Sequence, residues 1–137
     1  LKGALPVALF LYFYSKPAAN QELTALFVGL CAVLGHMFTP FLGFKGGKGV
    51  ATGSGVICAS FPYLFAVTLS AWLLTFFLSR IVSLSSILAV IALFLSGVLT
   101  RQPWEILVVF FGMVLLVLWS HRSNIRKLML GQEHRWS

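Results

Sequence analysis

Residues 50–79 read VATGSGVICASFPYLFAVTLSAWLLTFFLS, a run without a charged residue and with a proline near its middle. A bilayer core is crossed by about twenty residues of α-helix, so this run is too long for one span. Pro62 removes a backbone hydrogen bond and kinks or breaks a helix. The sequence therefore predicts two membrane segments here, a short helix over about 50–61 and a full one over about 63–79.

The composition of the whole chain is that of a membrane protein. Hydrophobic residues make up 59% of its 137 residues and charged residues 9%, and the mean hydropathy is +0.96. A soluble domain of this size could not hide so much apolar surface. Four more apolar segments flank the central run, over 3–14, 23–42, 84–99 and 104–120. We expect an all-α polytopic integral membrane protein with about six membrane helices in one domain over residues 1–137.

The distribution of Lys and Arg tests this number of segments. With six segments, two basic residues face one side and eight face the other; the two are Lys16 and Arg101, and the eight are Lys2, Lys45, Lys48, Arg80, Arg122, Arg126, Lys127 and Arg135. With residues 50–79 as one span, the division becomes four against six. Cytoplasmic loops carry the excess of Lys and Arg, so six segments fit better. Topology and anionic membrane lipid then explain the net charge of +7, with no basic face for nucleic acid.

A loop rich in glycine and lysine follows the second segment, on the predicted cytoplasmic face. Residues 35–52 read GHMFTPFLGFKGGKGVAT. Glycines let backbone N–H groups converge on phosphate oxygens, and lysines supply the opposing charge. The loop is not a nucleotide-binding P-loop, because Gly47-Lys48 is followed by Gly49 instead of Ser or Thr. A plain tight turn is the alternative to a phosphate site, which would be held by Lys45, Gly46, Gly47, Lys48, Gly49 and Thr52.

Three polar side chains near the predicted cytoplasmic face are candidate site residues, and each also has a purely structural interpretation. His36 lies in the apolar segment before the loop, and ionisable groups at membrane depth are functional candidates because they are costly. A packing histidine bonded to a backbone carbonyl is the equal alternative. Ser83 and Ser86 follow Arg80 on the same side, where serines commonly act as helix caps.

The segment after the last span carries further candidates. Residues 121–133 read HRSNIRKLMLGQE, and on a continuing helix His121 and Asn124 share a face and point toward one site. Alone, such a basic stretch is more often an interfacial amphipathic helix. The segment contains one of only three acids; the other two, Glu22 and Glu105, fall at span boundaries on the external face. We therefore expect no carboxylate pair for general acid–base catalysis.

Together these motifs resemble a known family. GHMFTPFLGFKGGKGVATG, followed by HRSNIRKLMLGQE, resembles the second and third motifs of the bacterial acyl-phosphate:glycerol-3-phosphate acyltransferases of the PlsY type. LKGALPV at the beginning is similar to that family's second helix, so the resemblance covers essentially the whole chain. The long glycine–lysine motif is highly specific, and the third motif is moderately so. A complete family member has about seven membrane helices.

The resemblance implies an enzyme that transfers a fatty acyl group from acyl phosphate to the 1-hydroxyl of sn-glycerol 3-phosphate, giving lysophosphatidic acid and phosphate. It implies the bacterial cytoplasmic (inner) membrane, with active-site loops facing the cytoplasm. We expect a monomer without cofactor or metal. A phosphate oxygen of the acyl donor is expected to accept the hydroxyl proton, because acids are so scarce.

Family roles carry to particular residues of this chain. Lys48 matches a substrate-phosphate ligand, and the backbone around it matches an anion cradle formed by Gly46, Gly47 and Gly49. His121 and Asn124 match contacts to glycerol phosphate, and Ser83 and Ser86 match a serine-containing family segment. With His36, a candidate because of its ionisable group in an apolar segment, the candidate catalytic residues are His36, Lys48, His121 and Asn124.

One departure from the family pattern affects the expected activity. The family's first motif, a serine-glycine-asparagine loop with a following arginine, precedes the LKGALPV helix and is absent from these residues. That loop supplies much of the phosphate site, so we expect an N-terminally truncated enzyme that is inactive alone. Two other classes remain open. A transporter of a phosphorylated solute would need polar residues through its spans, and a non-catalytic membrane scaffold would leave the phosphate site unexplained.

Overall fold

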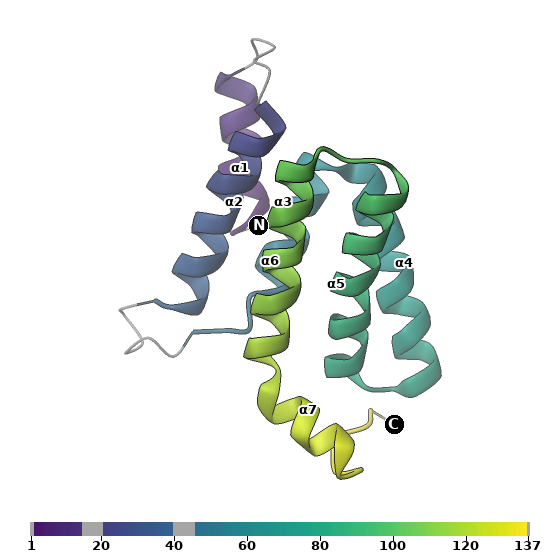
Figure 1. Ribbon diagram of the computed structural model, residues 1–137. Helices are drawn as coiled ribbons and strands as arrows, with labels where there is room; N and C mark the ends of the chain where they lie inside the picture. Colours follow the sequence, from purple (N-terminus) through teal and green to yellow (C-terminus); the bar gives the residue numbers. More distant parts are fainter. Residues whose placement is uncertain (1, 15–20, 40–45, 137) are drawn as a thin grey trace. The chain divides into compact units, whose positions relative to one another are not determined.

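The computed structural model describes residues 2–14, 21–39 and 46–136 (Figure 1). The described residues form seven α-helices: α1 (Ala4–Phe13), α2 (Gln21–Met37), α3 (Val50–Ser60), α4 (Pro62–Ser79), α5 (Val82–Leu99), α6 (Trp104–Ser120) and α7 (Arg122–Met129). The chain divides into two compact units, residues 1–65 and 66–137, and α4 crosses the boundary between them. The all-α class is confirmed, and a single domain stays a prediction.

The break at Pro62 lies where the sequence predicts it. α3 ends at Ser60, Phe61 leaves helical geometry with φ −138°, and α4 begins at Pro62. Proline suits the first position of a helix because its missing N–H has no intrahelical acceptor there. The long apolar run is therefore two helices.

Close backbone approach joins the three helices of the first unit. α1, α2 and α3 each contact the other two. A β-carbon at Gly3 would collide with the carbonyl oxygen of Thr52, and one at Gly29 would collide with the side chain of Val56. Small residues at such contacts let helix backbones come close, which is a usual means of packing helices in membranes. The helix that follows the glycine–lysine loop is thus held directly against α1 and α2.

α2 ends earlier than the sequence analysis predicts. The predicted segment covers 23–42, whereas the helix ends at Met37, and residues 40–42 lie outside the described part of the chain. Pro40 disfavours helical geometry in the residue before it. In addition, the N–H of Gly46 donates to the carbonyl oxygen of Met37 at 3.1 Å. This bond satisfies one of the carbonyls that a helix end leaves without an intrahelical partner.

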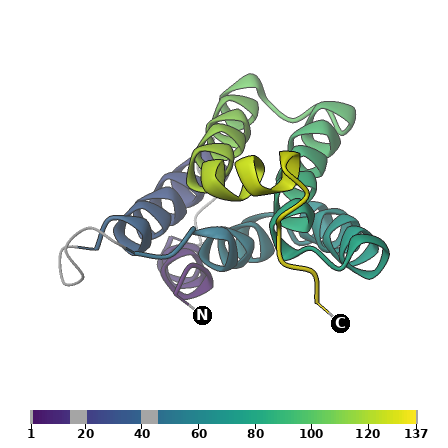
Figure 2. The same ribbon diagram turned by 90° about the horizontal axis from the view of Figure 1, so that it is seen from below.

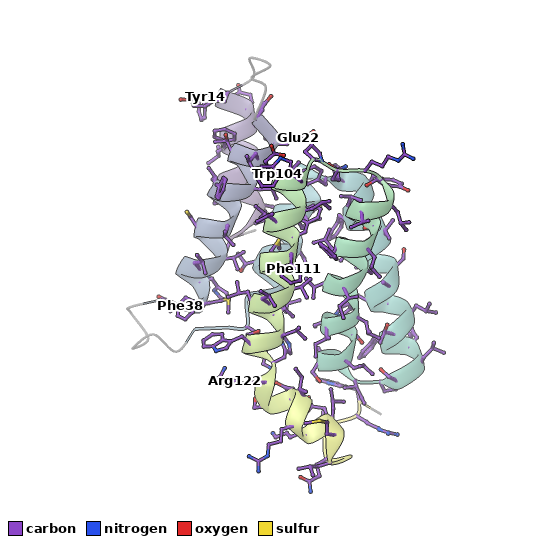
Figure 3. The ribbon with its side chains drawn as sticks, in the orientation of Figure 1. Tyr14, Glu22, Phe38, Trp104, Phe111 and Arg122 are labelled. Atoms are coloured by element: carbon purple, nitrogen blue, oxygen red, sulfur yellow. The ribbon has the colours of Figure 1, made fainter. Side chains whose placement is uncertain are left out.

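The second unit is built on α5 and α6, which run side by side in opposite directions (Figure 1). A β-carbon at Gly97 of α5 would lie 2.9 Å from Cδ2 of Phe110 on α6. Phe94 and Phe111 pair across the same interface with ring centroids 5.7 Å apart, and Figure 3 labels Phe111. α7 bends away from α6 by 63°, which Figure 2 shows from below. The bend at His121 corrects the expectation of one continuing helix.

Membrane-spanning length varies among the helices. By length and composition, α4 and α5 are candidate spans within the described ranges, and α6 with α7 adds a third if the bent pair is one span. α1, α2 and α3 are shorter apolar helices. Each of the six predicted apolar segments therefore contains a helix, but only some of these helices have the full length of a span.

Candidate functional site

The glycine–lysine segment, residues 46–49, lies against the last turn of α2. A β-carbon at Gly46 would collide with the carbonyl oxygen of His36 and lie 2.6 Å from that of Met37. A β-carbon at Gly47 would lie 2.5 Å from Nε2 of His36. An alanine at either position would force a neighbour to move. Backbone packing therefore favours glycine at position 46, the end of the His36 side chain lies against Gly47, and the structure brings His36 to the predicted phosphate site.

Gly49 starts α3 directly after Lys48. Its φ of +79° lies in the left-handed region that favours glycine, and its carbonyl oxygen accepts the first helical bond, from the N–H of Gly53 at 2.8 Å. The first N–H groups of a helix have no acceptor within it, and the positive end of the helix dipole lies there. With the exposed side chain of Lys48, this helix start has the chemistry of an anion site.

Thr52 and Lys45 are the other two side chains predicted to hold phosphate. Thr52 is buried in the first turn of α3, where its carbonyl oxygen and methyl group lie against Gly3. The structure thus gives Thr52 a packing contact with the start of α1. Lys45 lies outside the described residues. Phosphate binding by either residue stays a prediction.

A second polar cluster lies in the other unit and centres on Glu133. Oε1 of Glu133 accepts hydrogen bonds from the hydroxyl of Ser83 and from the side-chain amide of Asn124, each at 2.6 Å. Ser83 is buried in the first turn of α5. The N–H of Trp136 donates to the carbonyl oxygen of Arg80 at 2.9 Å and ties the same segment to the turn before α5. One carboxylate oxygen therefore joins two predicted site residues.

Glu133 is the site residue that the sequence analysis missed. Glu133 has no predicted role, because general acid–base catalysis by carboxylates would need a pair. A different signal was present, because Glu133 is the one acid of three on the predicted cytoplasmic side, where Ser83 and Asn124 also fall. An ionised carboxylate only accepts hydrogen bonds, so a lone one among hydroxyl and amide donors organises them.

His121 lies at the bend between α6 and α7 and is only 2% exposed. Its Nδ1 is 2.9 Å from the carbonyl oxygen of Val117 and 3.1 Å from Oγ of Ser120. A carbonyl oxygen only accepts, so Nδ1 carries a hydrogen and donates it. In a neutral ring Nε2 is then the acceptor nitrogen. The end of α6 orients the ring, and contact of His121 with glycerol phosphate stays a prediction.

Ser86 is bonded inside the second unit. Its hydroxyl donates to the carbonyl oxygen of Val82 at 2.9 Å and accepts from the indole N–H of Trp72 at 3.3 Å. The N-cap of α5 is Ile81, which makes no side-chain cap. The interpretation of Ser83 and Ser86 as helix caps is therefore wrong, and their contact with substrate stays a prediction.

The functional groups of the two clusters suit binding and orientation. His36 and residues 46–49 belong to the first unit, and the Glu133 cluster belongs to the second. Within the described ranges, no three His, Cys, Asp or Glu side chains form a group that could hold a metal ion. Ammonium, amide, hydroxyl and imidazole groups all form hydrogen bonds with phosphates and hydroxyls.

Comparison with known proteins gives consistent matches. The family model for glycerol-3-phosphate acyltransferase matches residues 1–131. The glycerol-3-phosphate acyltransferase of Aquifex aeolicus (strain VF5) is 39% identical over 136 residues, with 99% of this chain and 69% of the relative covered. That of Pseudomonas putida (strain KT2440) is 40% identical over 136 residues, with 98% and 68% covered. The chain thus spans about two thirds of the length of these relatives.

Two crystal structures of PlsY, an integral membrane glycerol 3-phosphate acyltransferase, share the fold. Its glycerol 3-phosphate form gives a TM-score of 0.88 at 36% identity, covering 98% of this chain and 66% of that one. Its lysophosphatidic acid form gives 0.87 at 36% identity, covering 98% and 67%. These matches favour an acyltransferase over the transporter and scaffold alternatives. The chain therefore belongs to the glycerol-3-phosphate acyltransferase family and has the all-α fold of an integral membrane enzyme.

Proposed function

We propose that this chain forms the greater part of an enzyme that transfers a fatty acyl group from acyl phosphate to the 1-hydroxyl of sn-glycerol 3-phosphate. The hydroxyl oxygen forms a bond with the acyl carbon, and the bond from that carbon to the phosphate oxygen breaks. The hydroxyl proton passes to the leaving phosphate. The products are lysophosphatidic acid and inorganic phosphate, and no protein group is changed.

The observation that carries this proposal is the glycine–lysine segment at the start of α3. Both substrates bear phosphate groups, which need several donors and a compensating charge. The exposed Lys48 lies two residues before Val50, the first residue of α3, where the N–H groups of a helix start favour an anion. The family match over residues 1–131 supports the same chemistry.

The Glu133 cluster supports a second role, in holding the acceptor substrate. Glu133 already accepts bonds from Ser83 and Asn124, so it orients these side chains. His121, fixed by the end of α6, and Asn124 on α7 are proposed to contact glycerol phosphate. With Glu133 engaged in this way, a phosphate oxygen of the acyl donor is the base that the reaction needs.

We place the enzyme as a monomer in a bacterial cytoplasmic membrane, with α7 on the cytoplasmic face. The guanidinium of Arg122, labelled in Figure 3, lies 4.7 Å from the centre of the Trp119 ring and donates to the Trp119 carbonyl oxygen at 3.0 Å. Tryptophan and arginine are typical of the membrane–water boundary. Arg126 and Lys127 in the last turn of α7 add the charge that anionic lipid attracts.

The test is an assay of an extended protein, meaning these 137 residues joined to an N-terminal helix that carries the serine-glycine-asparagine loop and its arginine. With acyl phosphate and glycerol 3-phosphate in detergent, we expect equal amounts of lysophosphatidic acid and inorganic phosphate. An acyl-CoA of the same chain length serves as the control donor and should give no product. Product from acyl-CoA alone would contradict the proposed donor.

A further inference from the structure

Successive glycines of the glycine–lysine segment meet different parts of α2. A β-carbon at Gly46 would collide with the backbone carbonyl of His36. A β-carbon at Gly47 would instead meet the imidazole ring of His36, with Nε2 at 2.5 Å, Cε1 at 3.3 Å and Cδ2 at 3.5 Å. Gly46 therefore lies against backbone atoms of α2, whereas Gly47 lies against a side chain of α2.

The residues on both sides of Lys48 are held in this way. Gly47 lies against the His36 ring, and a β-carbon at Gly49 would lie 2.8 Å from Sδ of Met37. Lys48 itself is exposed, whereas His36 is half-buried. The residues on either side of Lys48 thus lie close to side chains in the last turn of α2.

We propose that His36 is a positioning residue for the phosphate site. Its imidazole acts as a spacer that holds Gly47 at a set distance from α2, and this directs Lys48 and the amide groups before α3 toward the substrate phosphate. The inference rests on the proposed function, because that function assigns phosphate to this segment. Loss of a spacer raises the KM for glycerol 3-phosphate, whereas loss of a catalytic histidine lowers kcat and loss of one that only bonds a backbone carbonyl changes neither.

A matched pair of glycine substitutions tests this dependence in the extended protein. Gly47→Ala displaces the ring, so we expect the KM for glycerol 3-phosphate to rise about tenfold, the scale of losing one good hydrogen bond to phosphate, with a smaller change in kcat. In a His36→Ala background there is no ring to displace, so Gly47→Ala should add little. Gly46→Ala meets backbone atoms, so its effect should be the same in both backgrounds.

Two control variants separate the bulk of the ring from other effects. His36→Phe keeps a ring of similar width, so Gly47→Ala should be as harmful in that background as in the parent. Gly35 is on the same helix, and a β-carbon there would have nothing within 4 Å. Gly35→Ala should therefore leave KM and the melting temperature unchanged.

The collision between a β-carbon at position 47 and the His36 ring should also change the melting temperature in detergent, measured without substrate. Gly47→Ala should lower the melting temperature, and adding His36→Ala should restore it. Equal effects of Gly47→Ala on KM with and without His36 would overturn the proposal. A fall in kcat of about 100-fold or more for His36→Ala at unchanged KM would also overturn it, because general acid–base catalysis has that size. Failure of the proposed function would appear differently, as no lysophosphatidic acid from the extended parent.

Discussion

Lys48 is the residue on which the proposed phosphate binding by the first unit depends. It stands between Gly47 and Gly49, whose contacts with α2 leave its side chain exposed at the start of α3. An ammonium group is a compact point charge that binds phosphate well. Residue type and spacing alone carry this inference, and the phosphate role of Lys48 and its glycines stays a prediction.

We expect Lys48→Ala to lower kcat/KM of the extended protein by more than tenfold, because the phosphate loses its main countercharge in a partly desolvated site. Steady-state kinetics with varied glycerol 3-phosphate measure the change. Lys127→Ala, which removes an equal charge from the exposed side of α7, is the control and should have little effect. Activity above a tenth of the parent in Lys48→Ala would contradict the assignment.

Glu133 gives a prediction about stability. Glu133→Ala removes the acceptor of the buried Ser83 hydroxyl, which should cost about 1–3 kcal/mol of unfolding free energy. Glu133→Gln keeps an acceptor oxygen and should cost less. Thermal unfolding in detergent measures both. The double variant with Ser83→Ala should lose less than the sum of the two single losses, because the residues interact directly; strictly additive losses would show that this bond contributes nothing.

The role of Glu133 could not be predicted from local spacing. Its bond with Ser83 joins residues 50 positions apart. Sequence patterns identify neighbours along a helix, but a contact between α5 and the segment after α7 depends on tertiary structure. The same limit explains why serines that look like helix caps are engaged elsewhere.

At the scale of helices, the break between α3 and α4 was predictable, and two other boundaries were not. Pro62 acts locally, through its own ring and missing N–H. The end of α2 depends also on a bond from Gly46, and the 63° bend after α6 occurs at His121, where no proline or glycine marks it. Boundaries set by tertiary contacts leave no such local signal.

The break at Pro62 predicts the side of the membrane that the end of the chain faces. With Cys31 and Cys58, both free, replaced by alanine, a cysteine introduced as His134→Cys should react with impermeant reagent from the cytoplasmic side only. Arg101→Cys should react from the opposite side, which makes it the matched control. External labelling at position 134 would mean that residues 50–79 cross the membrane once.

At the scale of the molecule, composition and charge were enough to predict a helical membrane protein with six apolar segments. They could not predict how the helices pack. The contacts of Gly3 with Thr52 and of Gly29 with Val56 depend on which small residues face each other across a helix pair. Glycines are frequent in the chain, and their pairing partners are not marked in the sequence.

The first family motif gives the prediction that concerns the whole enzyme. We expect the 137-residue chain alone to be at least about a hundredfold less active than the extended protein, the scale of losing one preorganised donor. The reason is that Lys48, a few backbone amides, His121 and Asn124 are few ligands for two phosphate groups. Both proteins are assayed in the same detergent after their helicity has been checked. Equal rates would mean that the first motif is dispensable.

The bond between Ser83 and Glu133 also has a consequence for biosynthesis. A ribosome adds about 5–20 residues per second, so the 50 residues between the two partners take about 3–10 seconds to make. During that interval Ser83 is already in the chain, while its carboxylate partner does not yet exist. A nascent chain halted before residue 133 therefore lacks the carboxylate that accepts hydrogen bonds from both Ser83 and Asn124. Arrival of the C-terminal segment sets the moment at which this cluster forms.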